Sequence, residues 1–487
     1  MIPGYIADIG LEVHAELQTQ SKMFCSCPVV DTTRALPNTA VCPVCAGMPG
    51  ALPVANARAI EYALQVALAL DCQVAETSQF ARKNYFYPDL PKGYQISQFE
   101  FPLAVKGTLS AWSEEGWINI RIRRVHLEED TAKLTHMDQG DGKPFTLVDL
   151  NRAGIPLLEV VSEPDLHSVD QVRAYTRSLR RVLQYLAVNS GDLEKGVIRF
   201  EANVSVRPAG SDHLGTRVEI KNLNSFRAVT DAITHELKRQ TALLEAGSSI
   251  DQETLGWDET RGMTFSQRTK EEAHDYRYFP DPDLPPVEVS GEWLEGVRET
   301  MPEMPDARRE RFVRDLGLTP YDAGVITAGR EVADFFEACQ ALYPRAKIVA
   351  NWVMGDLSYL LKEEDEDMAV SELRITPEHL AGLLKLQEEG VLSGKMAKEV
   401  FAEAFKTGKA PAVIVDERGL HQISDTGEME AVVLRVIAEN PNSVQDYRGG
   451  KQKALGFLVG QVMKATRGRA NPQLANQLLR QHLQDQP

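Results

Sequence analysis

Long hydrophobic runs are absent from the sequence: no uninterrupted apolar stretch is long enough to span a bilayer. The first eight residues have neither the basic start nor the apolar segment of a signal peptide. We therefore expect a cytoplasmic protein with no membrane partner. Cysteine is scarce as well, with 6 in 487 residues, and in the cytosol free thiols or metal sites are more common than disulfides.

Basic residues are fewer than acidic ones, and a phosphate-binding loop motif is not evident. Lys and Arg number 53 against 70 Asp and Glu, a formal net charge of −17, which argues against non-specific nucleic-acid binding by the whole surface. No Gly-x-x-x-x-Gly-Lys-[Ser/Thr] loop stands out, which argues against a P-loop fold. What remains is ordinary for a globular protein, with 43% hydrophobic and 25% charged residues. The length predicts roughly two to four domains.

Several strands predicted from alternating hydrophobicity share one design, with an apolar face toward a core and an open, charged face. They cover residues 6–17, 117–130, 198–207 and 216–221. The second changes phase, and a β-bulge near Arg123 and Arg124 would return its apolar residues to the core. Helices over 55–71, 167–185 and 229–246 are also predicted. The open faces would present Glu12, His14, His126, Glu128, Asp130, Arg199, Glu201, Asn203, Glu219 and Lys221.

The stretch 147–165 reads as two short strands broken at Gly154 and Pro156, both apolar enough to lie in a core. It nevertheless contains Asp149, Asn151, Arg152 and Glu159. Buried carboxylates without partners are costly or become protonated. A positive group must therefore meet them, either Arg and Lys from elsewhere in the chain or a bound cation. A structural ion-pair network and a functional site both satisfy this requirement.

Four of the six cysteines fall in two close pairs, Cys25 with Cys27 and Cys42 with Cys45, within a turn-rich segment. Paired thiolates at this spacing suit tetrahedral zinc. Because four thiolates leave no open position at the metal, we predict a structural Zn²⁺ knuckle at 25–45. The alternative is four free buried cysteines.

The segment 81–98 joins two basic residues, Arg82 and Lys83, to three consecutive aromatic residues and a basic loop broken by Pro and Gly. Such a loop can stack a base or ribose and contact phosphates. A structural turn anchored by aromatic side chains is the alternative, which composition alone slightly favours. A polar and aromatic segment at 268–286, dense in proline, reads as a last active-site segment followed by a linker.

Helical patterns dominate from residue 293, including 305–316, 331–342, 357–362 and 377–388, and a small separate helical module follows residue 408. From Pro441 onward, seven basic residues face two acidic ones, a local charge of 7 − 2 = +5. A local basic patch on an acidic protein is typical of a specific nucleic-acid contact. A basic surface that docks on an acidic partner is equally compatible with the composition. The patch includes Arg448, Lys451, Lys453, Lys464, Arg467 and Arg469.

The mixed charges of the open strand faces predict a particular chemistry. Carboxylates together with a histidine can hold a hard divalent ion such as Mg²⁺ or Mn²⁺. Arginine and lysine suit phosphates. The combination therefore favours metal-assisted phosphoryl transfer from a nucleotide.

Longer motifs run through the same segments. They are 10–14 (Gly-Leu-Glu-Val-His), 82–88, 93–98, 126–130 (His-Leu-Glu-Glu-Asp), 149–152 (Asp-Leu-Asn-Arg), 159–165, 201–205, 219–225, 275–280 (Asp-Tyr-Arg-Tyr-Phe-Pro) and 456–465. With these motifs the chain closely resembles the B-subunit family of the heterotrimeric tRNA-dependent amidotransferases, over essentially its whole length.

The resemblance implies an α+β fold and an activity. The fold would comprise a mainly antiparallel cradle domain similar to glutamine synthetase at 1–292, a helical domain at 293–408 and a helical tail at 409–487 that holds the tRNA elbow. The protein would use ATP and Mg²⁺ to phosphorylate the side-chain carboxylate of Glu or Asp misacylated on tRNA(Gln) or tRNA(Asn). Ammonia from a partner amidase (A) subunit would displace the phosphate, and a small C subunit would complete the heterotrimer.

The resemblance also implies roles for individual residues. The Mg²⁺ ligands would be His14, Glu128 and Glu159. The neighbours of the nucleotide or the acyl group would be Glu12, Lys83, Arg152, Glu201, Asn203 and Lys221. The chain departs from the family pattern at 131–133, where Thr-Ala-Lys replaces Ala-Gly-Lys and alters the local turn, and at Glu201, where Asp is frequent. The four cysteines occur only in some members, so the zinc prediction rests on their spacing.

Two other functions are compatible with the residues. A non-catalytic adaptor would bind tRNA and scaffold the amidase, with ion-pair networks on its strand faces, and would not hydrolyse ATP. A free-standing ligase for small molecules would have no use for the basic tail.

Overall fold

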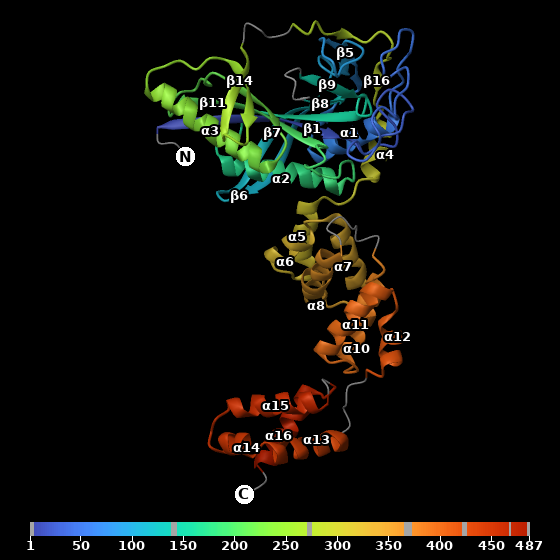
Figure 1. The fold of residues 1–487 in the computed structure, drawn as a ribbon, viewed down its shortest axis with the longest axis vertical. Helices are drawn as coiled ribbons and strands as arrows, with labels where there is room; N and C mark the ends of the chain where they lie inside the picture. The colour runs from blue at the N-terminus through green and yellow to red at the C-terminus, as the bar shows by residue number, and fades with distance from the viewer. Residues whose placement is uncertain are drawn as a thin grey trace. The chain divides into compact units, whose positions relative to one another are not determined.

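A twelve-stranded, mainly antiparallel sheet organises the first part of the chain (Figure 1). The computed structural model describes residues 4–137, 144–269, 275–364, 373–420, 426–466 and 469–484. The strand order is β14-β13-β12-β11-β1-β10-β7-β5-β4-β15, with β6 beside β7 and β2 beside β6. The strands are β1 (Tyr5–Glu16), β2 (Gln73–Val74), β4 (Ala81–Asn84), β5 (Tyr94–Ser97), β6 (Ala104–Ser113), β7 (Gly116–Glu129), β10 (Pro156–Ser162), β11 (Ile198–Pro208), β12 (Val218–Leu223), β13 (Glu253–Asp258), β14 (Met263–Thr269) and β15 (Phe279–Pro280).

The alternation predicted for the strands is confirmed. In β11 the alternate residues from Ile198 to Val206 are buried, and in β1 Ile9, Leu11 and Val13 lie in the same core. The bulge in β7 is also present: Arg124 pairs with Val161 and Ile122 with Ser162, so the residue between them is the extra one. Because of this bulge, apolar residues on both sides of it reach the core.

Three helices pack against the apolar face of the sheet, opposite the face that carries the charged side chains (Figure 1). They are α1 (Ala57–Ala69), α2 (Val169–Tyr185) and α3 (Phe226–Glu245). Asn56, Ser168 and Ser225 begin them, because each side chain accepts a hydrogen bond from a backbone N–H of the first turn. The α+β class is therefore confirmed, and the likeness to glutamine synthetase stays a prediction.

Two expectations from the sequence are corrected. β10 is buried throughout, but β9 (Phe145–Asp149) pairs with β8 (Lys133–Met137) in a separate two-stranded sheet, where Leu147 is 53% exposed. The expectation that both strands of 147–165 lie in a core is wrong for β9, whose residues are exposed or half-buried. The predicted basic loop after 87 is partly strand, because β4 and β5 form a hairpin of the main sheet. β3 (Thr77–Ser78) and β16 (Val287–Glu288) form a further small pair.

The chain divides into two compact units, residues 1–304 and 305–487. Helix α4 (Gly291–Glu299) belongs to the first unit, because Trp293, Leu294 and Val297 pack on its core. The boundary between units thus falls after Met304, whereas the sequence predicts a domain boundary at 292/293. The division into a helical domain and a tail at 408/409 stays a prediction.

The second unit contains two separate hydrophobic cores, one between Phe312 and Val415 and the other between Met429 and Leu483. The predicted helices at 305–316 and 377–388 are present with those bounds. None of the described helices is long and apolar enough to cross a membrane. The helices are α5 (Pro305–Leu316), α6 (Pro320–Ile326), α7 (Arg330–Leu342), α8 (Ala346–Trp352), a π-helical turn (Val353–Leu357), α9 (Ser358–Glu364), α10 (Pro377–Glu388), α11 (Gly394–Thr407), α12 (Pro411–Arg418), α13 (Thr426–Glu439), α14 (Pro441–Arg448), α15 (Lys453–Ala465) and α16 (Pro472–Gln484).

Candidate functional site

A row of polar side chains crosses three adjacent strands on the charged face of the sheet, where His126 and Glu159 are buried. His14 on β1 stands opposite Glu159 on β10, and Glu159 stands opposite His126 on β7. Side chains directly opposite one another on antiparallel strands are close enough to interact. Strand pairing therefore brings together residues that are far apart in the sequence.

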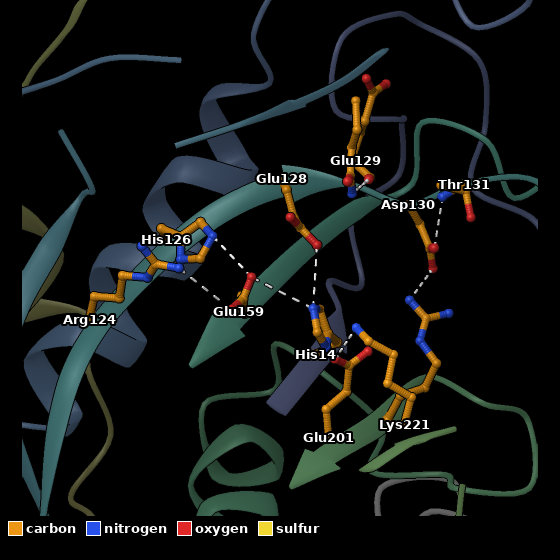
Figure 2. A network of polar contacts seen from close by, with 12 residues as sticks. His14, Arg124, His126, Glu128, Glu129, Asp130, Thr131, Glu159, Glu201 and Lys221 are labelled. Carbon is orange, nitrogen blue, oxygen red and sulfur yellow. Dashed lines mark hydrogen bonds and ion pairs between the residues drawn. The ribbon is translucent and has the colours of Figure 1, made fainter. Parts of the chain in front are cut away.

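His14, Glu128 and Glu159 form what we call the carboxylate centre. His14 Nε2 lies 3.5 Å from Glu128 Oε1 and 3.6 Å from Glu159 Oε2. Figure 2 shows Glu128 pointing toward His14, while its neighbour Glu129 points away. One imidazole and two carboxylates, with one ligand atom from each within 4.8 Å of the others, fit a hard divalent cation such as Mg²⁺.

The three groups of the carboxylate centre shift one another's pKa. Burial alone would lower the pKa of His14, but the hydrogen bond and charge of Glu159 and the charge of Glu128 raise it to about 9. Burial and the nearby Glu159 raise the pKa of Glu128. For Glu159 the two histidines outweigh burial and hold its pKa well below the usual range. The two carboxylates therefore favour the positively charged form of His14.

Two further groups border the centre. His126 Nε2 lies 3.1 Å from Glu159 Oε2, while the buried Nδ1 of His126 has no partner among the described residues. Arg124 Nη2 lies 3.9 Å from Glu159 Oε1 (Figure 2). Basic side chains from both neighbouring strands, β1 and β7, therefore lie close to the carboxylate of Glu159.

The predicted residues Glu12, Glu201, Asn203 and Lys221 lie together on β1, β11 and β12. Lys221 Nζ lies 2.7 Å from Glu201 Oε2 and 3.3 Å from Glu219 Oε1. Asn203 Nδ2 donates to Glu12 Oε1 at 3.0 Å. Burial and the charges of Glu159, Glu201 and Glu219 raise the pKa of Glu12. Carboxylates outnumber cations here, as in the neighbouring carboxylate centre.

Lys83 reaches the charged face from β4 and is half-buried. Burial would lower its pKa, but the charges of Glu128 and Glu159 and the nearby tyrosines raise it. Its ammonium lies 4.9 Å from the ring centroid of Tyr276 and 5.8 Å from that of Tyr85. Among the described residues no carboxylate forms an ion pair with it, so this cation is held by rings and by longer-range attraction to the centre.

Arg152 follows the loop that leads into β10. Its Nε and Nη2 donate to the backbone carbonyls of Thr131 and Ala132, both at 2.9 Å, and its Nε lies 3.8 Å from Asp130 Oδ2. Arg199 donates to the same carboxylate at 2.8 Å. Arg152 therefore supports the chain immediately after the strand that carries Glu128.

The four cysteines gather into what we call the cysteine centre, with their four sulfurs within 4.8 Å of one another. Cys45 Sγ lies 4.0 Å from Cys27 Sγ and 3.9 Å from Cys42 Sγ. Tetrahedral zinc with Zn–S bonds of about 2.3 Å places its sulfurs about 3.8 Å apart. A hydrogen bond from Cys25 lowers the pKa of Cys45 to about 4 despite burial, and Lys22 contributes. Geometry and a ready thiolate thus fit Zn²⁺.

The cysteine centre is attached to the loop 149–152. Ala40 N donates to Asn151 Oδ1 at 2.8 Å, and Asn151 Nδ2 donates to the carbonyl of Leu36 at 2.8 Å. Asn38 N donates to Asp149 Oδ1 at 2.9 Å. Asp149 and Asn151 of the Asp-Leu-Asn-Arg motif therefore bind the knuckle segment. Arg152 of the same motif binds the backbone after β7 instead.

The predicted tail residues lie on and between α14, α15 and α16. Each one that the structure describes is exposed, and Lys451 Nζ lies 2.8 Å from Asp446 Oδ1. Arg467 lies outside the described residues. The exposed members are Arg448, Lys451, Lys453, Lys464 and Arg469.

Comparison with known proteins shows the family. A family model described as the GatB/GatE catalytic domain matches residues 7–295, more than half of the chain and the whole region of both centres. The chain belongs to this family. A second model of the same family, the GatB domain, matches residues 334–483.

Relatives in the family match over nearly their whole length. A protein from Moorella thermoacetica is 55% identical over 98% of this chain and 100% of the relative. One from Caldanaerobacter subterraneus subsp. tengcongensis is 53% identical over 98% of this chain and 99% of the relative. One from Geotalea uraniireducens is 53% identical over 98% of both chains. Each is named as the B subunit of an aspartyl/glutamyl-tRNA(Asn/Gln) amidotransferase.

Several residues at these centres were not singled out by the sequence. Alternation places His126 and Glu219 on open faces, but nothing in the sequence marks them above their neighbours. Lys22 lies beside the cysteines, and its burial could not be anticipated, because a lysine next to a turn is ordinarily exposed. The family resemblance does not point to it either.

Proposed function

We propose that this chain is the subunit that activates a tRNA-linked carboxylate in an amidotransferase. It would use ATP to phosphorylate the side chain of Glu or Asp misacylated on tRNA, and then amidate it with ammonia. The observation that carries this proposal is the carboxylate centre, whose three donors come from three adjacent strands and are flanked by Lys83 and Lys221. The family membership and the names of the relatives supply the substrate class.

The reaction explains why the site needs both signs of charge. A carboxylate is a poor electrophile, so one of its oxygens first takes the γ-phosphoryl group and ADP leaves. Ammonia then attacks the carbonyl carbon, a C–N bond forms, the C–O bond to phosphate breaks and inorganic phosphate leaves with one proton lost from nitrogen. The first step brings two anions together, which is unfavourable unless cations lie close by.

The chain's own residues would meet this demand in two ways. His14, Glu128 and Glu159 would hold Mg²⁺, which when bound offsets the repulsion between phosphate and carboxylate. Lys83 and Lys221 would offer ammonium groups to the nucleotide or the acyl group. Glu12, Glu201 and Asn203 would fix Lys221 and the neighbouring charges in place. Arg152 would keep the chain after Glu128 in position through its two carbonyl contacts.

Other parts of the chain would serve assembly. The cysteine centre would hold a structural Zn²⁺. The basic tail, including Arg467, would contact the phosphates of the tRNA. An amidase A subunit would supply ammonia, and a small C subunit would complete the heterotrimer. The cytoplasm, where tRNA is aminoacylated, would be the site of this reaction.

ATP hydrolysis tests this proposal against the adaptor. The chain is co-expressed with its amidase partner and assayed for phosphate release with and without misacylated tRNA, without an ammonia source. Phosphate release that requires charged tRNA and Mg²⁺, and that disappears in His14→Ala, is expected. A complex that binds the tRNA but releases no phosphate in any combination would favour the adaptor.

A further inference from the structure

Lys22 is a fully buried lysine, with 0% of its surface exposed. Lysine is almost never buried completely unless its charge is paired, because an ammonium removed from water loses several kcal/mol of hydration. The groups around Lys22 must therefore compensate its buried ammonium.

The surroundings offer two carbonyl oxygens and one sulfur. Lys22 Nζ donates to the carbonyls of Ala40 at 2.8 Å and Leu150 at 3.1 Å, and it lies 3.6 Å from Cys45 Sγ. No carboxylate in the described parts of the chain forms an ion pair with it. A thiolate of the cysteine centre is therefore the anion within reach of this ammonium.

A metal site made of four thiolates suits such a neighbour. Zn²⁺ with four thiolates carries a formal charge of 2 − 4 = −2, and one adjacent ammonium reduces the local charge to −1. An N–H···S contact also fixes the sulfur that accepts it, and partners of this kind tune metal affinity. Four neutral thiols, in contrast, would leave Lys22 as an uncompensated buried charge.

The same ammonium reaches the loop that supports the carboxylate centre. Leu150, whose carbonyl accepts from Lys22, lies between Asp149 and Asn151, which hold the knuckle segment. Arg152 at the end of this loop holds the carbonyls of Thr131 and Ala132. Lys22 is thus bonded at once to a cysteine of the centre and to the loop.

We propose that Lys22 is the positioning residue of the cysteine centre: it supplies the counter-charge of the four-thiolate metal site and ties that site to the loop 149–152. The inference rests on the proposed Zn²⁺ site. It concerns a residue that takes no part in the reaction itself.

Zinc affinity tests the counter-charge. The full chain and its Lys22→Met variant, which keeps an unbranched side chain one atom shorter and removes the charge, compete for zinc with a chromophoric chelator. We expect affinity to fall by about 10- to 100-fold, the usual effect of losing such a partner. Lys195→Met removes a partly exposed lysine that pairs with Asp31 and Asp192, and it should leave the affinity unchanged.

Lys22→Arg and Lys22→Gln separate charge from packing. Arginine keeps the charge and should retain most of the affinity, whereas glutamine keeps a donor for the carbonyls and should lose affinity as methionine does. If Lys22→Met does not fold, this pair decides the question by itself. Equal zinc affinity in the glutamine variant and the wild type, or equal loss in the arginine and glutamine variants, would overturn the counter-charge.

Hydrogen exchange tests the tie to the loop. In zinc-loaded protein, amides of 148–154 should exchange faster in Lys22→Gln than in wild type, because the Leu150 carbonyl and the knuckle are held less firmly. Lys195→Met should leave this segment unchanged. Identical exchange in Lys22→Gln and wild type would overturn the tie. A wild-type protein that binds no zinc would instead refute the Zn²⁺ site, whatever the variants do.

Discussion

The carboxylate centre and the cysteine centre lie in the same compact unit but are built in opposite ways. The carboxylate centre sits on three paired strands, where burial and Glu159 raise the pKa of Glu128 while two histidines lower the pKa of Glu159. The cysteine centre sits in loops, and its charge has a buried ammonium beside it. One imidazole and two carboxylates suit a hard cation that keeps positions open for a ligand, whereas four thiolates leave no open position at a metal and suit a structural site.

The largest effect is expected from Glu159→Gln, which removes one charge from the carboxylate centre. Amidation of misacylated tRNA by the assembled complex should fall by about 100-fold or more, the scale of losing one preorganised electrostatic group. Binding of the aminoacyl-tRNA should remain. Glu163→Gln is the matched control, because Glu163 follows the same strand and pairs with the exposed Arg123; its activity should be unchanged. Loss of tRNA binding in Glu159→Gln would point to a structural role for the centre.

The next effect is expected from Cys42→Ser, which removes one ligand of the cysteine centre. The purified chain should lose its zinc, and stability should fall because a bound metal stabilises only the folded state. At free zinc 100-fold above the dissociation constant the difference is about 2.7 kcal/mol. Metal analysis and urea unfolding with and without zinc measure it. Cys72→Ser should retain both zinc and stability, and equal zinc content in the two variants would exclude the proposed ligand set.

The two centres also differ in how far the sequence predicts them. Strand alternation locates His14, Glu128 and Glu201 on one face, because the period of a strand is fixed and the bulge in β7 can be inferred from a single phase change. Spacing alone brings the cysteines together. Neither argument identifies His126 as the neighbour of Glu159, since that contact depends on the register between β7 and β10.

The sequence does not predict the burial and contacts of residues outside the main sheet. β9 reads as a core strand, but it pairs with β8 in a separate two-stranded sheet, and its residues are exposed or half-buried. The burial of Lys22 and the contacts of Asn151 arise from loops folded against each other, and no local pattern specifies such contacts. Through such contacts the Asp-Leu-Asn-Arg motif joins the knuckle segment to the chain that follows β7.

A smaller effect is expected from Asn151→Ala, which breaks the connection between the two centres without touching a ligand of either. Asn151 is fully buried, and its loss leaves the backbone N–H of Ala40 without its acceptor. Urea unfolding should show a loss of about 1–3 kcal/mol, the usual penalty for such an unpaired group. Asn119→Ala changes an exposed residue that accepts from Ser110 and should cost less than about 0.5 kcal/mol. Equal stability of the two variants would mean that the connection contributes nothing.

The smallest effect is expected at the isolated cysteines when zinc is removed. Burial raises the pKa of Cys72 to about 12, with help from the charge of Asp71, and burial likewise raises the pKa of Cys339 to about 12. Both thiols therefore stay protonated below about pH 12, and only the thiolate reacts with an alkylating agent. At pH 8, chelation of zinc should expose Cys45, whose pKa is lowered to about 4, to iodoacetamide and leave Cys72 and Cys339 as slow as before. Mass spectrometry of the alkylated peptides separates the two groups. If the isolated cysteines react as fast as Cys45, the contrast between a metal-holding cluster and inert core thiols fails.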